Sequence, residues 1–300
     1  MTSLAVVIGD RMYDLRDAAK AARVTGFNAA WAKGGIEAML HDWRAASPWL
    51  RRVANAVPDA IAGKKIKAIG TAPKNCLVPY KAQRIFCAAA NYVDHIKEMD
   101  TALAAKAVSQ PYHFLKLQNA VIGYGESVKL PPETKKLDWE VELAAVIGKR
   151  ARRVSVAKAL DIVAGYTVVN DVSARDLNGR TDYPFKHDWF RGKAHDTFAP
   201  FGPCIVPAWL IKDPQNVMLK LTVNGETMQN DSSKGMIWTL AEQIAYLSTI
   251  VTLEPGDVIA TGTPAGVGMG RGIFLKPGDV MEASAEGIGT MRNPVIAEKI

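Results

Sequence analysis

The stretch DWEVELAAVIG, residues 138–148, carries the strongest indication of the fold. Its β-branched and apolar residues, followed by a glycine, predict a strand. Because side chains alternate between the two faces of a strand, Glu140 and Glu142 are expected to project from one face. Trp139 and Leu143 are expected to project from the other. Two like charges held side by side repel each other, so this segment fits either a cation site or a solvent-facing strand that carries two acids.

A third carboxylate follows a second apolar strand. The run AGYTVV at residues 164–169 leads through Asn170 into Asp171. A carboxylate at the end of a buried strand is costly unless it is paired or bound to a metal. Three carboxylates without a suitably spaced histidine or cysteine favour a hard cation over zinc. We therefore expect a site for Mg²⁺ or Mn²⁺, and Ca²⁺ is also compatible with such ligands.

A possible general base lies upstream, in CAAANYVDHIKEMD at residues 87–100, where His95 and Glu98 stand three positions apart. If residues 94–99 form a helical turn, the two side chains lie on one face and can form a hydrogen bond. A carboxylate that orients an imidazole is a common way to make a base that activates water. Such pairs also occur on exposed helices, so the spacing alone fits either reading.

Two further segments are candidates for substrate contact. Lys193 follows a glycine in RGKAHDTFAPFGP at residues 191–203, and in a partly desolvated loop it would neutralise an oxyanion or enolate. The alternative is an ordinary surface lysine. The Gly-rich stretch ATGTPAGVGMGRG at residues 260–272 lacks the Lys-Ser/Thr ending of a phosphate loop. It offers backbone N–H groups and the Thr263 hydroxyl to an anionic substrate instead.

The composition changes along the chain, which predicts two unequal domains. Residues 1–75 favour a small N-terminal α/β domain, with helices expected at residues 14–22 and 35–57. After a Pro-punctuated connector at 73–79, short β-branched runs predict a β-rich α+β domain over residues 76–300, with helices at 156–163 and 239–249. Two units of that domain, LEPGDVIATGTP and LKPGDVMEASAEG, share the string PGDV and are expected to lie in one sheet.

Charge, cysteine content and the N-terminal residues exclude several classes of protein. The net charge is +7, but the basic residues are scattered and lack interleaved aromatic residues, so we expect no nucleic-acid partner. The charge fits small anionic substrates. Three widely spaced cysteines predict neither disulfides nor a zinc site. No apolar run is long enough to cross a bilayer and no targeting signal is recognisable, so the expected location is cytoplasmic.

Together these motifs resemble the fumarylacetoacetate hydrolase superfamily. Its members include acylpyruvate hydrolases, fumarylpyruvate hydrolases, oxaloacetate decarboxylases and 2-hydroxyhepta-2,4-diene-1,7-dioate isomerases. The resemblance covers roughly residues 80–300, and the motifs occur in the family's order: ANYVDHIKEM, FLK, DWEVELAAVIG, NDVSARDLN, GKAHDTFAPFGP, GDVIATGTPAGVG and EGIGTMRNPV.

The resemblance implies a fold and a set of roles. It implies a mixed β-roll catalytic domain with a small N-terminal domain, usually assembled as a homodimer. It also implies metal ligands at Glu140, Glu142 and Asp171, a catalytic group of His95, Glu98 and Lys193, and substrate contacts at Lys116, Arg175, Asn178 and Thr263.

The implied activity is divalent-metal-dependent hydrolysis of a carbon–carbon bond in a 1,3-diketo acid of the acylpyruvate type. The products would be a 2-oxo acid and a carboxylic acid, as in aromatic catabolism. The alternative is a decarboxylase, isomerase or hydratase that acts on a related 2-oxo acid, such as oxaloacetate or 2-hydroxyhepta-2,4-diene-1,7-dioate. A catalytically silent ligand-binding protein is a third possibility, which the His95–Glu98 pair disfavours.

Overall fold

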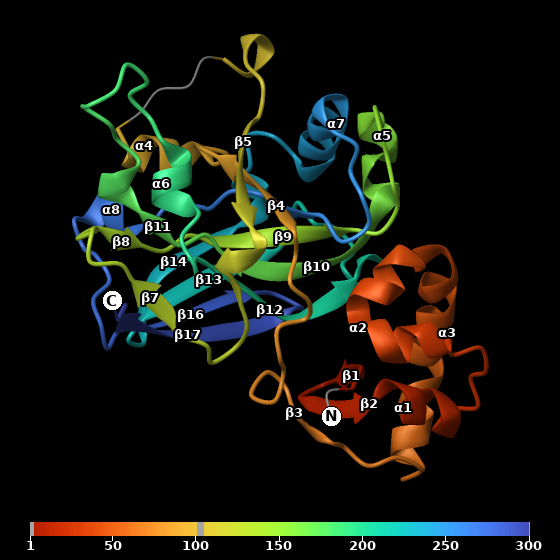
Figure 1. Cartoon of the computed structure of the whole chain (residues 1–300). Coiled ribbons are helices and arrows are strands. Elements are labelled where there is room, and N and C mark those ends of the chain that lie inside the picture. Colours follow the sequence, from red (N-terminus) through yellow and green to blue (C-terminus); the bar gives the residue numbers. More distant parts are fainter. Residues whose placement is uncertain (1–2, 101–104, 300) are drawn as a thin grey trace.

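The computed structural model describes residues 3–100 and 105–299, and it is a strand-rich mixture of helices and sheets (Figure 1). The N-terminal part contains a small antiparallel sheet of three strands, in the order β1-β2-β3, with three helices beside it. Its elements are β1 Ala5–Ile8, β2 Arg11–Asp14, α1 Leu15–Ala21, α2 Ala29–His41, α3 Trp43–Ala62 and β3 Gly70–Thr71.

The N-terminal helices differ from the prediction in one respect. The single helix expected at residues 35–57 is two helices, α2 and α3, which meet at Asp42. The Asp42 carboxylate accepts a hydrogen bond from the indole of Trp31, at 3.0 Å. Trp31 also packs on Trp49 of α3, with ring centroids 5.2 Å apart. The break therefore lets the two helices fold onto one aromatic cluster.

The centre of the molecule is a seven-stranded sheet in the order β5-β4-β15-β9-β10-β12-β6. Most neighbours are antiparallel, whereas β15 runs parallel to β4 and β12 parallel to β6. The central pair β9 and β10 is fully buried. The strands are β4 Arg84–Ala89, β5 Tyr112–Leu117, β6 Val121–Ile122, β9 Val141–Ile147, β10 Val163–Asn170, β12 Ala199–Pro207 and β15 Val258–Ala260.

A five-stranded sheet in the order β14-β13-β16-β17-β7 packs against the central sheet, as β10–β16 and β9–β13 contacts show (Figure 1). Its strands are β7 Val128–Leu130, β13 Met218–Val223, β14 Glu226–Ser232, β16 Val280–Ala285 and β17 Gly289–Ala297. The remaining elements are the paired strands β8 Leu137–Asp138 and β11 Ser173–Ala174, and the helices α4 Val93–Glu98, α5 Val156–Ala159, α6 Trp189–Lys193, α7 Leu240–Ile250 and α8 Gly268–Arg271.

The two faces of β9 enter different cores, as its alternating side chains predict. Val141 and Leu143 belong to a core that contains residues of both large sheets, which we call the inter-sheet core. Ala144 and Val146 belong to a second core that also includes Trp43 of α3, which we call the helix-facing core. The N-terminal helices therefore share buried surface with the central sheet.

The two PGDV units form the same turn but enter different sheets, so the expectation of one shared sheet was wrong. In each unit the aspartate accepts the backbone N–H three residues before it: Glu254 N to Asp257 at 2.7 Å, and Lys276 N to Asp279 at 2.9 Å. The first turn leads into β15 of the central sheet, and the second into β16 of the five-stranded sheet. Local turn chemistry does not choose the partner strand.

The cysteines agree with the expectation drawn from composition, whereas one predicted helix differs in length. Among the described residues, no helix combines the length and apolar content that a membrane crossing requires. All three cysteines are free thiols. The predicted helix at 156–163 is shorter than expected, because α5 ends at Ala159 and a single 3-10 turn leads into β10.

Candidate active site

Three carboxylates meet where β9 begins and β10 ends. The backbone N–H of Asp171 donates to the carbonyl of Glu140 at 2.8 Å, which aligns these two residues at one end of the strand pair. Each of Glu140, Glu142 and Asp171 contributes one carboxylate oxygen to a group whose members all lie within 4.8 Å of one another. We call this group the acid triad. All three residues are buried, with exposed fractions of 6%, 0% and 0%.

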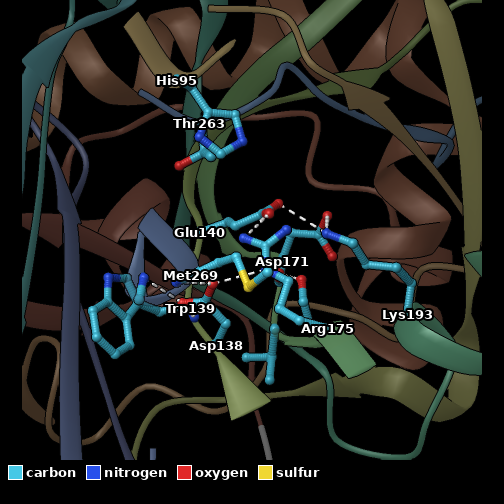
Figure 2. Close-up of polar contacts among 12 residues, drawn as sticks. His95, Asp138, Trp139, Glu140, Asp171, Arg175, Lys193, Thr263 and Met269 are labelled. Atoms are coloured by element: carbon cyan, nitrogen blue, oxygen red, sulfur yellow. Dashed lines mark hydrogen bonds and ion pairs between the residues drawn. The ribbon is translucent and has the colours of Figure 1, made fainter. Parts of the chain in front are cut away.

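Three cations pair with two members of the acid triad, Glu140 and Asp171, and Figure 2 shows two of them, Arg175 and Lys193. The Lys193 ammonium lies 2.9 Å from Glu140 Oε2 and 2.7 Å from Asp171 Oδ2. Lys116 Nζ lies 2.6 Å from Asp171 Oδ1, and Arg175 Nη2 lies 2.6 Å from Glu140 Oε1. Buried carboxylates are tolerated when they are paired in this way.

The neighbouring opposite charges determine the protonation states of Glu140 and Lys193. Burial alone would favour the neutral carboxylic acid, but Arg175 and Lys193 hold the pKa of Glu140 well below its usual range. Burial likewise opposes the charged ammonium, but Asp171 and Glu140 raise the pKa of Lys193. Both groups therefore remain charged at neutral pH.

Glu142 is the exception in the acid triad. Its Oε2 accepts the backbone N–H of Gly262 at 2.8 Å, whereas its buried Oε1 has no partner among the described residues. Burial first, and then the charges of Asp171 and Glu140, raise the pKa of Glu142 well above its usual value. A carboxylate oxygen that is buried and unpaired beside two other acids is what a bound cation would satisfy. An all-oxygen donor set fits a hard divalent metal.

The predicted base lies on α4, close to the acid triad. His95 Nδ1 is 3.4 Å from Glu98 Oε2, and His95 is 7% exposed. Glu98 also accepts the backbone N–H of Gly266, at 2.9 and 3.0 Å from its two oxygens. Burial opposes ionisation of Glu98, but the hydrogen bonds from His95 and Gly266 lower its pKa. The Gly-rich segment contacts both groups, because the N–H of Gly262 donates to Glu142 and the N–H of Gly266 donates to Glu98, so the pair and the acid triad border the same segment.

The sequence suggested that Lys193 lies in a loop, but the structure places it in a helix. It is the last residue of the short helix α6, which Asp188 caps by accepting the N–H of Arg191 at 3.2 Å. Its side chain is 1% exposed, and the ammonium lies 5.1 Å from the ring centre of Phe114. The fully buried ammonium is directed at Glu140 and Asp171, so its charge is part of the site.

The four residues expected to contact substrate occupy different positions. Arg175 lies against Glu140, as described above. Lys116 is fully buried, and its ammonium also lies 2.8 Å from the Val172 carbonyl and 2.6 Å from the Phe198 carbonyl. Contact between Lys116 and a substrate would therefore require it to give up one of three partners.

Thr263 and Asn178 differ in what they leave unpaired. The Thr263 hydroxyl donates to the Val141 carbonyl at 2.8 Å and accepts from the Gln229 amide at 2.7 Å. The Asn178 Oδ1 atom is buried without a partner among the described residues. It lies so close to Gly192 that a Cβ there would be 1.6 Å from it. Asn178 therefore offers a free acceptor, and Thr263 is fixed to β9.

Some residues of the site had no predicted role. Asp138 is completely buried and accepts the N–H groups of Gly268 and Met269, at 2.6 and 3.0 Å. Gln229 accepts the N–H of Val141 at 3.0 Å and so links β14 to β9. The role of Asp138 could have been suspected from the sequence, because Asp138 directly precedes the segment with the two glutamates. The backbone N–H groups of the Gly-rich segment bind the chain's own carboxylates, Glu142, Glu98 and Asp138.

Comparisons with known proteins identify the family of this chain. The family model described as fumarylacetoacetate (FAA) hydrolase C-terminal matches residues 84–296. The rat protein named oxaloacetate tautomerase Fahd2a, mitochondrial, is 39% identical over 218 residues, which cover 72% of this chain and 67% of that protein.

Two solved structures extend the comparison. A fumarylacetoacetate hydrolase from psychrophilic Exiguobacterium antarcticum superposes with a TM-score of 0.72 at 31% identity, over 98% of this chain and 95% of that one. A fumarylpyruvate hydrolase from Pseudomonas aeruginosa, solved in complex with Mn²⁺ and pyruvate, gives a TM-score of 0.65 at 31% identity, over 77% of this chain and 93% of that one. These matches confirm the resemblance seen in the motifs, and the chain belongs to the fumarylacetoacetate hydrolase family.

Proposed function

We propose that this chain is a divalent-metal-dependent enzyme that interconverts the keto and enol forms of a small 2-oxo dicarboxylic acid of the oxaloacetate type. The observation that carries the proposal is that one Gly-rich segment holds both Glu98, the partner of His95, and Glu142 of the buried acid triad. A tautomerase needs one group that moves a proton and a centre that stabilises enolate charge, and the site contains both. The similarity to the rat oxaloacetate tautomerase supports the same reaction class.

The proton is moved by His95. Its Nδ1 faces Glu98, so the neutral imidazole is best assigned with the proton on Nδ1, which donates to that carboxylate. The Nε2 atom is then free to take a proton from the carbon next to the keto group. The imidazolium gives this proton to the enolate oxygen, which yields the enol, and the reverse steps restore the keto form. Glu98 stabilises the imidazolium that forms in between, because its own pKa is lowered and it stays ionised.

The acid triad and its cations stabilise the charge. When bound at Glu140, Glu142 and Asp171, a divalent metal supplies Lewis-acid polarisation of a keto group. Lys193 directs two N–H groups at Glu140 and Asp171, which leaves its third N–H for a substrate oxygen. A net charge of +7 favours the approach of a dianionic acid.

The first experiment follows the ultraviolet absorbance of enol-oxaloacetate as it approaches the keto–enol equilibrium. Chelator-stripped protein is compared with the same protein reloaded with Mg²⁺ or Mn²⁺, and His95→Gln is compared with His187→Gln, which alters an exposed histidine. We expect metal-restored acceleration that His95→Gln removes and His187→Gln retains. Equal rates with stripped and reloaded protein would reject the proposal.

A second candidate is hydrolysis of an acylpyruvate, because an imidazole held by a carboxylate also suits activation of water. In that reaction His95 takes a proton from water, the hydroxide adds to the distal carbonyl, and the carbon–carbon bond breaks to a carboxylic acid and a 2-oxo acid. The fumarylpyruvate hydrolase similarity supports it. Incubation with an acylpyruvate, followed by product analysis, distinguishes the two reactions, since only hydrolysis releases both products.

A further inference from the structure

Asp138 is a buried carboxylate that the proposed reaction does not use. It is 0% exposed, lies at the end of β8, and precedes the predicted metal ligand Glu140 by two residues. Four N–H groups converge on it. Its Oδ1 accepts from Trp139 N at 2.7 Å and Gly268 N at 2.6 Å, and its Oδ2 accepts from Met269 N at 3.0 Å and Arg175 Nε at 2.7 Å.

The contact with Arg175 links Asp138 to the acid triad. Arg175 directs Nε at Asp138 and Nη2 at Glu140 Oε1, 2.6 Å away, so one guanidinium spans two carboxylates (Figure 2). Since Lys193 holds the other oxygen of Glu140, both oxygens of that carboxylate have a fixed partner. The planar guanidinium cannot turn toward Glu140 independently of Asp138.

The same carboxylate also fixes the Gly-rich segment on which the base depends. Asp138 accepts the N–H groups of Gly268 and Met269, and the neighbouring Trp139 indole donates to the Gly266 carbonyl at 3.1 Å. The N–H of Gly266 holds Glu98, the partner of His95. A Cβ on Gly268 would lie 2.1 Å from the Ile273 carbonyl and 2.7 Å from Asp138 Oδ1, so this close approach requires glycine.

From these contacts we infer that Asp138 is a positioning residue that aligns Arg175 on Glu140 and anchors the 266–269 segment beside Glu98. It does not touch the reacting atoms. The inference rests on the function proposed above only for its activity readout, because metal binding tests it independently. Removal of residues that orient metal ligands typically costs roughly 10- to 100-fold in metal affinity or activity.

The main variant is Asp138→Asn, which keeps the shape and removes the charge. In the orientation that still accepts from Trp139 and Gly268, its NH₂ group would face the Arg175 and Met269 donors. We expect Mn²⁺ binding to stripped protein, measured by isothermal titration, to weaken about 10-fold or more. The matched control is Asp257→Asn, another buried aspartate paired with an arginine, Arg84, far along the chain from the triad. It should leave Mn²⁺ binding unchanged.

A double-mutant cycle with Arg175→Lys separates positioning from a general structural effect. A lysine has a single ammonium, which cannot span Asp138 and Glu140 as the guanidinium does. If Asp138 acts through Arg175, Asp138→Asn should weaken Mn²⁺ binding little further in the Arg175→Lys background. Fully additive losses, or wild-type Mn²⁺ binding by Asp138→Asn, would overturn the inference.

If Asp138→Asn does not fold, Asp138→Glu and Arg175→Lys alone still decide the matter. Asp138→Glu retains the charge but displaces it from the four donors, so a positioning role predicts weakened Mn²⁺ binding. Wild-type Mn²⁺ affinity in both variants would refute the role of Asp138. If the wild-type protein bound Mn²⁺ but converted no 2-oxo acid, the proposed function would be rejected. The Mn²⁺ affinities of the variants would still test the role of Asp138.

Discussion

The acid triad and the His95–Glu98 pair both contact the Gly-rich segment, and they are held by different kinds of contact. Both oxygens of Glu140 and both oxygens of Asp171 are paired with the cations Lys116, Lys193 and Arg175. The pair is joined by one 3.4 Å contact, and the Glu98 side chain remains 16% exposed.

This difference separates two tasks. Charges that must bind a metal gain from being fixed before the metal arrives, because reorganisation would weaken binding. A group that exchanges protons must instead reach both its partner and the substrate, and catalytic hydrogen bonds are often long until a substrate binds. Changes on the triad side should therefore alter metal binding, and changes on the pair side should alter turnover alone.

The largest effect is expected from Glu142→Gln, which replaces the carboxylate whose Oε1 is buried without a partner among the described residues. Mn²⁺ affinity should fall by at least about 100-fold, the upper end for residues that only orient ligands. Turnover should fall with it. Isothermal titration measures the affinity, and Glu254→Gln at a surface ion pair is the control. Undiminished Mn²⁺ binding would show that the triad is not the metal site.

His95→Ala should affect the other side of the site. We expect turnover to fall roughly 10²- to 10⁴-fold, the usual contribution of a general base. Mn²⁺ affinity should stay at the wild-type value, because no contact joins His95 to the cations of the triad among the described residues. Steady-state kinetics combined with titration checks both. A parallel loss of metal affinity would contradict the proposed division of tasks.

Lys116→Met tests whether the triad cations stabilise the fold. The change removes the ammonium partner of Asp171 Oδ1 and of the Val172 carbonyl, whereas the Phe198 carbonyl still accepts the Val172 N–H. Breaking a buried pair costs about 3–5 kcal/mol. Urea unfolding of the metal-free protein measures this loss. Lys97→Met, at an exposed ion pair, should cost under about 0.5 kcal/mol. A raised KM with unchanged stability would instead support substrate contact by Lys116.

The smallest effect concerns His113 on β5. Burial lowers the pKa of His113 to about 4, although the Gln243 hydrogen bond opposes this shift, and its Nδ1 has no partner among the described residues. The folded state thus favours the neutral ring. Its stability contribution is complete above pH 6.5 and is lost as the pH falls toward 4, by about 3 kcal/mol in total.

His113→Phe should remove this acid sensitivity while it keeps the stacking on Tyr246. Unfolding free energies at pH 7, 5.5 and 4.5 provide the test. The variant should lose less stability over this range than the wild type does. Identical slopes for the two proteins would show that His113 does not titrate on unfolding.

Several parts of this site follow directly from the sequence. The strand predicted over 138–148 is interrupted, because β8 ends at Asp138 and β9 begins at Val141, so Glu140 lies just before β9. Glu142 still lies close to it, and the end of an apolar run brings Asp171 to both. Spacing of three on a helical turn brings His95 and Glu98 within 3.4 Å. These are local regularities of strands and helices, which short stretches of sequence encode.

Other parts depend on contacts between distant segments. Lys193 ends a five-residue helix, which is too short to show a hydrophobic periodicity in the sequence. The Lys193 side chain is buried because α6 packs on β5 and β11. Asp138 gains its role from Arg175 and from Met269, residues 37 and 131 positions away. The strands that follow the two PGDV turns likewise join different sheets, because each pairs with strands from distant parts of the chain.

The contact between Gly148 and Trp43 has a consequence for protein engineering. Gly148 directly follows the strand that carries Glu142, and a Cβ there would lie 2.6 Å from the Trp43 indole and 2.8 Å from the Ala164 methyl group. A chimera that joined residues 76–300 to an unrelated leader would leave that indole site vacant and the helix-facing core open to water. The N-terminal helices and the catalytic sheet should therefore be transplanted together, as a single cassette.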